Sequence, residues 1–331
     1  MEFSKIKEVL RGEPKYRISQ VNQVIFKDLV DGWEKATALP KTLREKLEKE
    51  CPLEIKSDVS IASDENTVKS LIQLADGKFI EAVLMKHDNR NTVCVSSMAG
   101  CPMRCAFCAT GQKLGFQRKL TSDEIIEQVL FFARFLKKQD ERVDSVVFMG
   151  MGEPFLNYDN VMEAVRVMND PSGFGIGARH ISISTCGIFD GIKKIEDEEL
   201  QLNLAISLHA PDDETRRKIM PVAETYTVKE LMVVVDEYIA KTKRKVMFEY
   251  LMIDGMNDSD MHAENLAQLL KKKLCMVNLI QYNDTGAFTA SSHNRMARFK
   301  EILEKHGIQT TMRYRFGRDI EGACGQLAAT R

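Results

Sequence analysis

The chain has 331 residues, of which 44% are hydrophobic and 29% are charged, and its formal net charge is −1. This composition is typical of a soluble globular protein, and the length suits one large domain with a smaller one, or two domains. The near-neutral charge excludes a strong overall positive field for nucleic acid. It leaves a local basic surface open, because net charge says little about how charges are distributed.

Targeting signals are not evident in the sequence. The stretch MEFSKIKEVLRGEPKYR has no apolar core of a signal peptide, and no apolar run approaches the roughly 20 residues of a membrane span. We therefore expect a cytoplasmic protein without membrane contact. In that compartment clustered cysteines serve metal binding or catalysis more often than structural disulfides, whereas the isolated Cys51 and Cys275 are expected to be buried or incidental.

The first predicted unit, residues 1–65, is helical. Apolar residues recur at helical spacing in YRISQVNQVIFKDLV and in KTLREKLEKE, and Leu39-Pro40 separates the two helices. Residues 66–86 begin a different pattern. The segments TVKSLIQL, GKFIEAVLM and NTVCVSS are short and alternating, with turn residues between them, which predicts a small antiparallel β extension.

From residue 108 onward, predicted strands alternate with predicted helices. Two of these helices begin at capping boxes, one formed by Thr121 and Glu124 and the other by Thr227 and Glu230. The alternation implies βαβ units and a parallel sheet. We therefore expect an α/β fold in which residues 87–317 form a partial (β/α)6 TIM-like barrel, followed by a C-terminal tail over residues 318–331.

Short polar motifs follow several of the predicted strands, namely GMGEP, STCG, SLHAP and QYND. Active residues of parallel barrels lie at the C-terminal ends of the strands. These motifs are therefore expected to meet on one rim of the barrel.

Three cysteines, Cys101, Cys105 and Cys108, follow the pattern C-x3-C-x2-C. A structural zinc site usually takes a fourth Cys or His nearby, and none lies within reach in the sequence. Three thiolates on a tight loop instead suit a [4Fe–4S] cluster that leaves one iron open to a small ligand. A structural metal knuckle in an RNA-binding protein is the alternative interpretation.

The cysteine pattern, with Phe107 before its last member, resembles the signature of radical S-adenosylmethionine (SAM) enzymes. GMGEP at residues 150–154 resembles their second motif, which holds the amino group of the cofactor. The resemblance implies a barrel of the radical SAM type. It also implies that the amino and carboxylate groups of SAM chelate the open iron.

Two further cysteines narrow the resemblance. Cys94, and Cys324 in ACGQLA, accompany EPKYR, LPKTLREKL, CATG, ISLHAPDDETR and VNLIQYN, and together they resemble the RlmN/Cfr family over nearly the whole chain. Members of this family methylate one adenosine in the peptidyl-transferase centre of 23S ribosomal RNA, and some RlmN members also modify transfer RNA. In the family the N-terminal helical region is an accessory RNA-binding domain.

Methylation of adenine explains why such a protein would carry an iron–sulfur cluster. C2 and C8 are sp2 carbons of an electron-poor ring, so they do not attack a methyl sulfonium, whereas a thiolate does. The resemblance implies that Cys324 first accepts a methyl group from one SAM. A second SAM, on the cluster, is then cleaved to a 5′-deoxyadenosyl radical that removes hydrogen from this methyl, and the resulting carbon radical adds to adenine.

The remaining catalytic roles also come from the resemblance. Cys94 resolves the protein–RNA crosslink through a transient disulfide with Cys324, and Glu81 matches the proton acceptor of the family. The expected SAM contacts are short groups at strand ends that suit a ribose, a carboxylate and an adenine edge; they are Gly152, Glu153, Ser184, Ser207, Leu208, His209 and Asn283. The need for one electron implies a low-potential donor of the flavodoxin or ferredoxin type, and we expect a monomer.

Several alternatives stay open. GMGEP and ISLHAPDDE are similar to RlmN, the C2 enzyme, which we favour, whereas RYRFGRDIEGACGQL is similar to Cfr, the C8 enzyme linked to antibiotic resistance. An activase of glycyl-radical enzymes would give Cys94 and Cys324 no role. Cys186 and the segment NDTGAFTASS depart from the family pattern. Basic residues suited to RNA are Arg104, Lys113, Arg118, Lys119, Arg313, Arg315 and Arg318.

Overall fold

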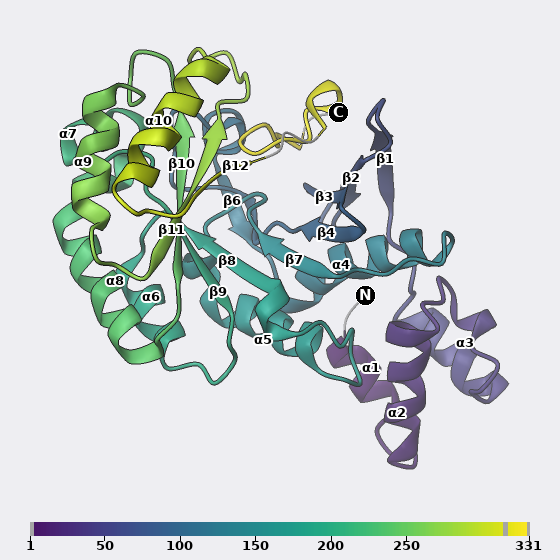
Figure 1. Ribbon diagram of the computed structural model, residues 1–331. Coiled ribbons are helices and arrows are strands. Elements are labelled where there is room, and N and C mark those ends of the chain that lie inside the picture. The colour runs from purple at the N-terminus through teal and green to yellow at the C-terminus, as the bar shows by residue number, and fades with distance from the viewer. Residues whose placement is uncertain (1–2, 314–316, 330–331) are drawn as a thin grey trace.

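A computed structural model describes residues 3–313 and 317–329 of the chain. Ten strands form one sheet in the order β1-β2-β3-β4-β7-β8-β9-β10-β11-β12, and β5 pairs with β6 in a separate ribbon. Figure 1 shows helices on the outer side of the central strands, with β1–β3 beyond them and the tail (yellow) between the two parts.

The strands are short, and most have buried residues. Their bounds are β1 (Ser57–Ile61), β2 (Thr67–Gln73), β3 (Phe79–His87), β4 (Arg90–Cys94), β5 (Met98–Gly100), β6 (Phe116–Lys119), β7 (Ser145–Phe148), β8 (Ile181–Thr185), β9 (Asn203–Ser207), β10 (Val246–Met252), β11 (Cys275–Gln281) and β12 (Thr310–Met312). The α-helices are α1 (Phe3–Val9), α2 (Tyr16–Asn22), α3 (Lys41–Glu50), α4 (Ser122–Lys137), α5 (Tyr158–Asn169), α6 (Phe189–Glu196), α7 (Asp213–Ile219), α8 (Val228–Thr242), α9 (Asp260–Leu270) and α10 (His293–Lys305).

The central part of the sheet is parallel. β4 pairs with β7, and each following strand pairs in parallel with the next as far as β12. Helices connect these strands, as the right-handed crossovers of a βαβ fold require. The predicted partial (β/α)6 barrel is confirmed, because helices join the parallel strands in an open series, and among the described residues β12 does not pair with β4.

The antiparallel extension is also present. β1 pairs with β2, β2 with β3, and β3 with β4, all antiparallel. Strand β4 belongs to both parts, since its other edge begins the parallel series. The extension is therefore continuous with the barrel sheet.

The N-terminal helices lie against helix α4 (Figure 1). The helix predicted in YRISQVNQVIFKDLV is present over residues 16–27, as α2 to Asn22 and then as a π-helical turn at Gln23–Lys27. The Arg134 guanidinium of α4 donates to the carbonyls of Val30 at 2.5 Å and Leu53 at 2.8 Å. These bonds satisfy carbonyls of the helical region, but the domain boundaries stay a proposal. None of the helices within residues 3–313 and 317–329 is long and apolar enough to cross a membrane.

Helix α4 holds the segment that leads into the cysteine loop. Its predicted capping box is confirmed, with Thr121 accepting from the Glu124 amide. One turn later, the buried Gln128 side chain accepts from the amide of Ser96 at 2.7 Å and donates to the carbonyl of Ser96 at 2.9 Å. The amide group of one glutamine thus replaces a strand partner for the backbone between β4 and β5.

We expect substitutions at Gln128 and at Thr121, the N-cap of α4, to lower the free energy of unfolding by different amounts. Replacing Gln128 by Leu leaves a buried N–H and a buried C=O of Ser96 without that partner, so we expect a loss of about 2–4 kcal/mol in the free energy of unfolding. Replacing Thr121 by Ala removes only the cap and is expected to cost about 1 kcal/mol. Urea unfolding of both variants measures the difference. Equal, small losses would show that water satisfies Ser96.

Candidate active site

The cysteine loop begins where β5 ends. Gly100 has φ +74°, and a Cβ there would lie 1.8 Å from the Gly115 carbonyl oxygen, so glycine is required. The Cys101 amide donates to the same oxygen at 2.8 Å. The turn that follows carries Cys105 and Cys108, and all three thiols line one cavity at the C-terminal ends of the barrel strands. We call this space the cluster cavity.

Burial controls the protonation of two of these thiols, Cys101 and Cys105. Loss of solvent raises the pKa of Cys101 to about 12 and that of Cys105 well above the usual range. Without a metal such thiols stay protonated, and binding of a metal would replace their protons. Within residues 3–313 and 317–329 no group of three or more Cys, His, Asp or Glu side chains is arranged to hold one metal ion. An all-thiolate donor set fits an iron–sulfur cluster, in which each cysteine binds a different iron.

Residues of the GMGEP motif line the same cavity as the cysteines. Gly152 has φ +102°, and a Cβ there would lie 2.7 Å from Ser97 Oγ and from Met98 Cβ. The buried Glu153 carboxylate accepts from the amide of Phe155 at 3.1 Å and from that of Cys186 at 2.8 Å. Burial raises the pKa of Glu153. This carboxylate ties the end of β7 to the end of β8.

The next two strand ends supply hydroxyl and imidazole groups. Ser184 Oγ and Ser207 Oγ lie 3.4 Å apart on β8 and β9, and both line the cluster cavity with His209. His209 Nδ1 accepts from the Leu251 amide at 3.1 Å, and its ring meets Phe107 edge to face at 4.9 Å. Leu208 does not line the cavity, because its side chain is fully buried in the core.

Arg216 fixes the backbone behind these residues. It is fully buried and donates to four carbonyls, those of Leu208, Tyr226, Cys186 and Ser207, at 2.7–3.3 Å. Such a cation is stable in a core only when its donors are satisfied. The loops after β8 and β9 are therefore held to one another by a single side chain.

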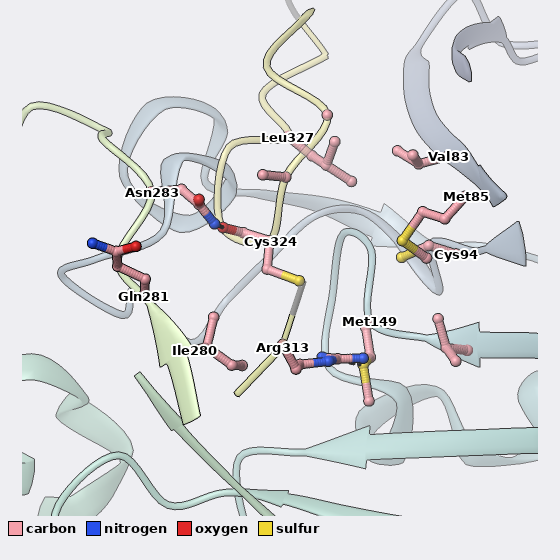
Figure 2. A pocket seen from close by; sticks show the side chains of 13 residues that line it. Val83, Met85, Cys94, Met149, Ile280, Gln281, Asn283, Arg313, Cys324 and Leu327 are labelled. Atoms are coloured by element: carbon pink, nitrogen blue, oxygen red, sulfur yellow. Dashed lines mark hydrogen bonds between the residues drawn. The ribbon is translucent and has the colours of Figure 1, made fainter. Parts of the chain in front are cut away.

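Figure 2 shows a second cavity. Cys94, at the end of β4, and Cys324, in the C-terminal tail, both line it with Met149 and Arg313. Both cysteines are free thiols. Cys324, Met149 and Arg313 also line the cluster cavity, so the two spaces share a wall. We call this second space the thiol cavity.

The two thiols have different surroundings. Cys94 is buried, and loss of solvent raises its pKa to about 12. Cys324 has an exposed side chain, yet the surrounding protein raises its pKa, and the Arg313 guanidinium opposes this rise. Arg313 is held by Glu249 at 3.4 Å. A fixed positive charge next to a thiol favours the thiolate.

Asn283 connects the tail to the end of β11. Its Nδ2 donates to the Cys324 carbonyl at 3.0 Å, and it lines the thiol cavity. Its Oδ1 is buried and has no hydrogen-bond partner among the described residues. Such an atom is costly unless a ligand donates to it. Asn283 does not line the cluster cavity, so the structure does not bring it together with the other expected SAM contacts there.

Glu81 lies on β3 outside both cavities. Its buried carboxylate pairs with Lys69 Nζ at 3.0 Å and accepts from the amides of Ala328 at 2.8 Å and Ala329 at 3.0 Å. In this structure it therefore faces the tail and a lysine. Its expected role as a proton acceptor stays a prediction.

Two residues of the site were not expected from the sequence. Glu249 is buried in β10, where its carboxylate accepts from Asn278 Nδ2 at 2.9 Å and faces Arg313. A charged residue in the middle of the apolar run VMFEYLM is a signal that could have identified it. Arg313 had been assigned to RNA but lies between the two cavities.

Of the other basic residues expected to contact RNA, one is paired with acidic residues and the side chains of two lie outside the described residues. Arg118 is bound by Asp76 and Glu124, each at 2.7 Å, so it stabilises the base of α4. Arg315 lies outside the described residues, as does the side chain of Arg318.

Known proteins resemble this chain over nearly its whole length. Residues 95–267 match the Radical SAM superfamily. The chain is 44% identical, over 99% of its length and 95% of the other, to a "Probable dual-specificity RNA methyltransferase RlmN" of Dictyoglomus turgidum. A protein of the same name from Clostridium tetani is 45% identical over 95% of this chain and 90% of its own. A crystal structure of a radical SAM methyltransferase from Sphaerobacter thermophilus covers 100% of this chain and 98% of its own, with 41% identity and a TM-score of 0.95.

The buried His209 predicts a pH dependence of stability. Burial, together with Arg216, lowers its pKa from 6.5 to about 3. Between these values the unfolded chain binds a proton that the folded chain does not, so stability is lost as pH falls below 6.5. From pH 7 to pH 5 this group alone removes about 2 kcal/mol of the free energy of unfolding.

The His209→Gln variant lacks this titration. Urea unfolding at the two pH values should therefore show a smaller loss for the variant than for the wild type, by about 2 kcal/mol. Identical losses would mean that His209 accepts a proton in the folded state.

Proposed function

The chain belongs to the RlmN family of radical SAM RNA methyltransferases, and we propose that it methylates C2 of one adenosine in 23S ribosomal RNA and of one adenosine in transfer RNA. The main support for this reaction is the thiol cavity. Cys94 and Cys324 face one space that shares a wall with the cluster cavity. A methyl carried by Cys324 would then lie between the cofactor and the substrate base.

The cluster cavity is the proposed cofactor site. Cys101, Cys105 and Cys108 would hold a [4Fe–4S] cluster, and Gly152, Glu153, Ser184, Ser207 and His209 would surround SAM. Leu208 would pack in the core next to His209 in the chain, and Asn283 would receive a donor at its unpartnered Oδ1 from the side of the thiol cavity. When bound, the reduced cluster and SAM supply the radical chemistry that removes a hydrogen atom from a methyl group.

Cys324 is the proposed methyl carrier. Its sulfur is exposed to both cavities, so it can reach a methyl sulfonium on one side and a base on the other. Arg313 would stabilise the attacking thiolate. An S–CH3 bond forms as the sulfonium S–CH3 bond breaks, and the thiol proton passes to solvent.

Cys94 is the proposed resolving residue. Its thiolate would attack the Cys324 sulfur once that sulfur is joined to the base through the transferred carbon. An S–S bond forms while the S–C bond breaks, and the released carbon takes a proton to become a methyl group. Burial disfavours the Cys94 thiolate, and the Arg313 guanidinium partly opposes this effect. A mostly protonated Cys94 would not attack other groups before the crosslink has formed.

The substrate would approach past the edge of the thiol cavity. Gln281 and Arg313 also line a neighbouring space with His87 and His293, and none of the residues that line it is acidic. Nitrogen donors of this kind suit the phosphates and riboses of RNA.

The N-terminal helices would add further RNA contacts. A flavodoxin- or ferredoxin-type protein would deliver electrons to the cluster. We expect the protein to be a monomer in the cytoplasm.

Analysis of the product nucleoside tests the regiochemistry. The anaerobic holoenzyme, SAM, a reductant and an unmodified 23S RNA fragment should yield 2-methyladenosine by mass spectrometry. A yield of 8-methyladenosine would contradict the C2 assignment and place the chain with the C8 enzymes. Formation of 5′-deoxyadenosine without any methylated adenosine would remove RNA as the substrate.

Two cysteine variants separate the proposed thiol roles. Cys324→Ala should abolish methylation, because no sulfur remains to carry the methyl group. Cys94→Ala should reduce turnover to a single event per chain or less and leave a covalent protein–RNA adduct, visible as a shifted band on a denaturing gel. Cys275→Ala, far from both cavities, is the control and should retain wild-type turnover. Normal turnover of Cys94→Ala would exclude a resolving role.

A further inference from the structure

The C-terminal tail is held by separate elements on both sides of Cys324. Before the cysteine, the Ser63 amide of the β1–β2 loop donates to Asp319 Oδ2 at 2.7 Å. After it, the Ala109 amide donates to the Gly325 carbonyl at 2.7 Å, and Thr110 Oγ1 donates to the Leu327 carbonyl at 2.5 Å. The tail therefore spans from the β extension to the cysteine loop and back.

The end of this path is the Glu81 carboxylate. One of its oxygens accepts the amides of Ala328 and Ala329, and the other faces the Lys69 ammonium. Glu81 is 2% exposed, and Leu327 and Ala328 are 4% exposed each, so these contacts are shielded from water. Hydrogen bonds from amides to a buried carboxylate are among the stronger ones in proteins.

The backbone around Glu81 is fixed as well. Its amide donates to Met151 Sδ at 3.3 Å, and its carbonyl accepts from Ser96 Oγ at 2.6 Å. Met151 belongs to the GMGEP motif, and Ser96 precedes the cysteine loop. These two hydrogen bonds fix the main chain of Glu81, and with it the carboxylate, relative to the proposed cofactor site.

Strand β3 aligns this contact with the thiol cavity. Side chains of a strand alternate between faces, so Glu81, Val83 and Met85 point to the same side. Val83 and Met85 line the thiol cavity, and Figure 2 shows both on the wall opposite Cys324. One face of β3 thus presents the tail contact and the cavity wall in succession.

We propose that Glu81, paired with Lys69, is a positioning residue that clamps the tail at residues 328–329 and so fixes the Cys324 thiol between the two cavities. The proposal rests on the proposed function only for what the fixed thiol does. While the clamp is closed, both carboxylate oxygens are engaged. In this arrangement Glu81 contacts the tail and Lys69 and lines neither cavity.

Three variants separate the clamp from proton transfer. Glu81→Gln keeps the size but cannot face an ammonium and two amides at once, because one of its ends is a donor. Ala328→Pro removes one of the two amide donors and leaves the carboxylate intact. Ala328→Ser keeps that amide and is the matched control.

Hydrogen exchange of the anaerobic holoenzyme with SAM measures the clamp directly. We expect exchange in residues 324–329 to rise about ten-fold or more in Glu81→Gln and Ala328→Pro, and to stay within about two-fold of wild type in Ala328→Ser. The kcat for RNA methylation should fall in the same two variants while KM for RNA stays within about three-fold, because the tail positions a reacting atom.

The outcomes are distinguishable. If Glu81→Gln stops methylation while tail exchange stays at the wild-type rate in both variants, Glu81 acts on the substrate alone and the clamp is wrong. If Ala328→Pro raises exchange but leaves kcat unchanged, the clamp does not position Cys324. If the wild type methylates no RNA but the exchange differences appear, the clamp stands and the proposed function fails.

Discussion

The join between the cysteine loop and the tail is the contact on which the active site depends. Ala109 and Thr110, directly after Cys108, bind the carbonyls of Gly325 and Leu327. Cys108 and Cys324 lie more than 200 residues apart in the sequence, yet two hydrogen bonds place their backbones side by side. Gly325 has φ +84°, and a Cβ there would lie 3.3 Å from the Phe107 carbonyl oxygen, so the close approach favours glycine.

The regular part of the fold was readable because its signals are local. Alternation of apolar strands with amphipathic helices predicted the open barrel, and the capping boxes at Thr121 and Thr227 set two helix starts correctly. Spacing within one loop likewise brought Cys101, Cys105 and Cys108 to one cavity. The helix expected after Tyr16 is present, but its change to a π-helical turn at Gln23–Lys27 was not predicted, because no composition signal marks it.

The parts of the site that were missed depend on long-range contacts. Arg313 is one of several arginines in its region, and only the fold shows that it meets Glu249 between the cavities. The engagement of Glu81 by Lys69 and the tail requires the register of β2 on β3, in which Leu71 lies opposite Glu81 and Lys69 lies diagonal to it. Motif spacing carries no information about such pairings. The sequence therefore could not predict that Glu81 contacts Lys69 and the tail.

The side chains of strand β3 alternate between its two faces with a period of two residues. Glu81, Val83, Met85 and His87 share one face, and over six residues a strand advances about 20 Å. A substitution at any of these positions changes one contact. By contrast, a single inserted or deleted residue between Phe79 and His87 would turn every later side chain of the strand to the opposite face. Side chains that now pack behind the thiol cavity would then form its wall. The family should therefore vary this strand in residue type far more readily than in length.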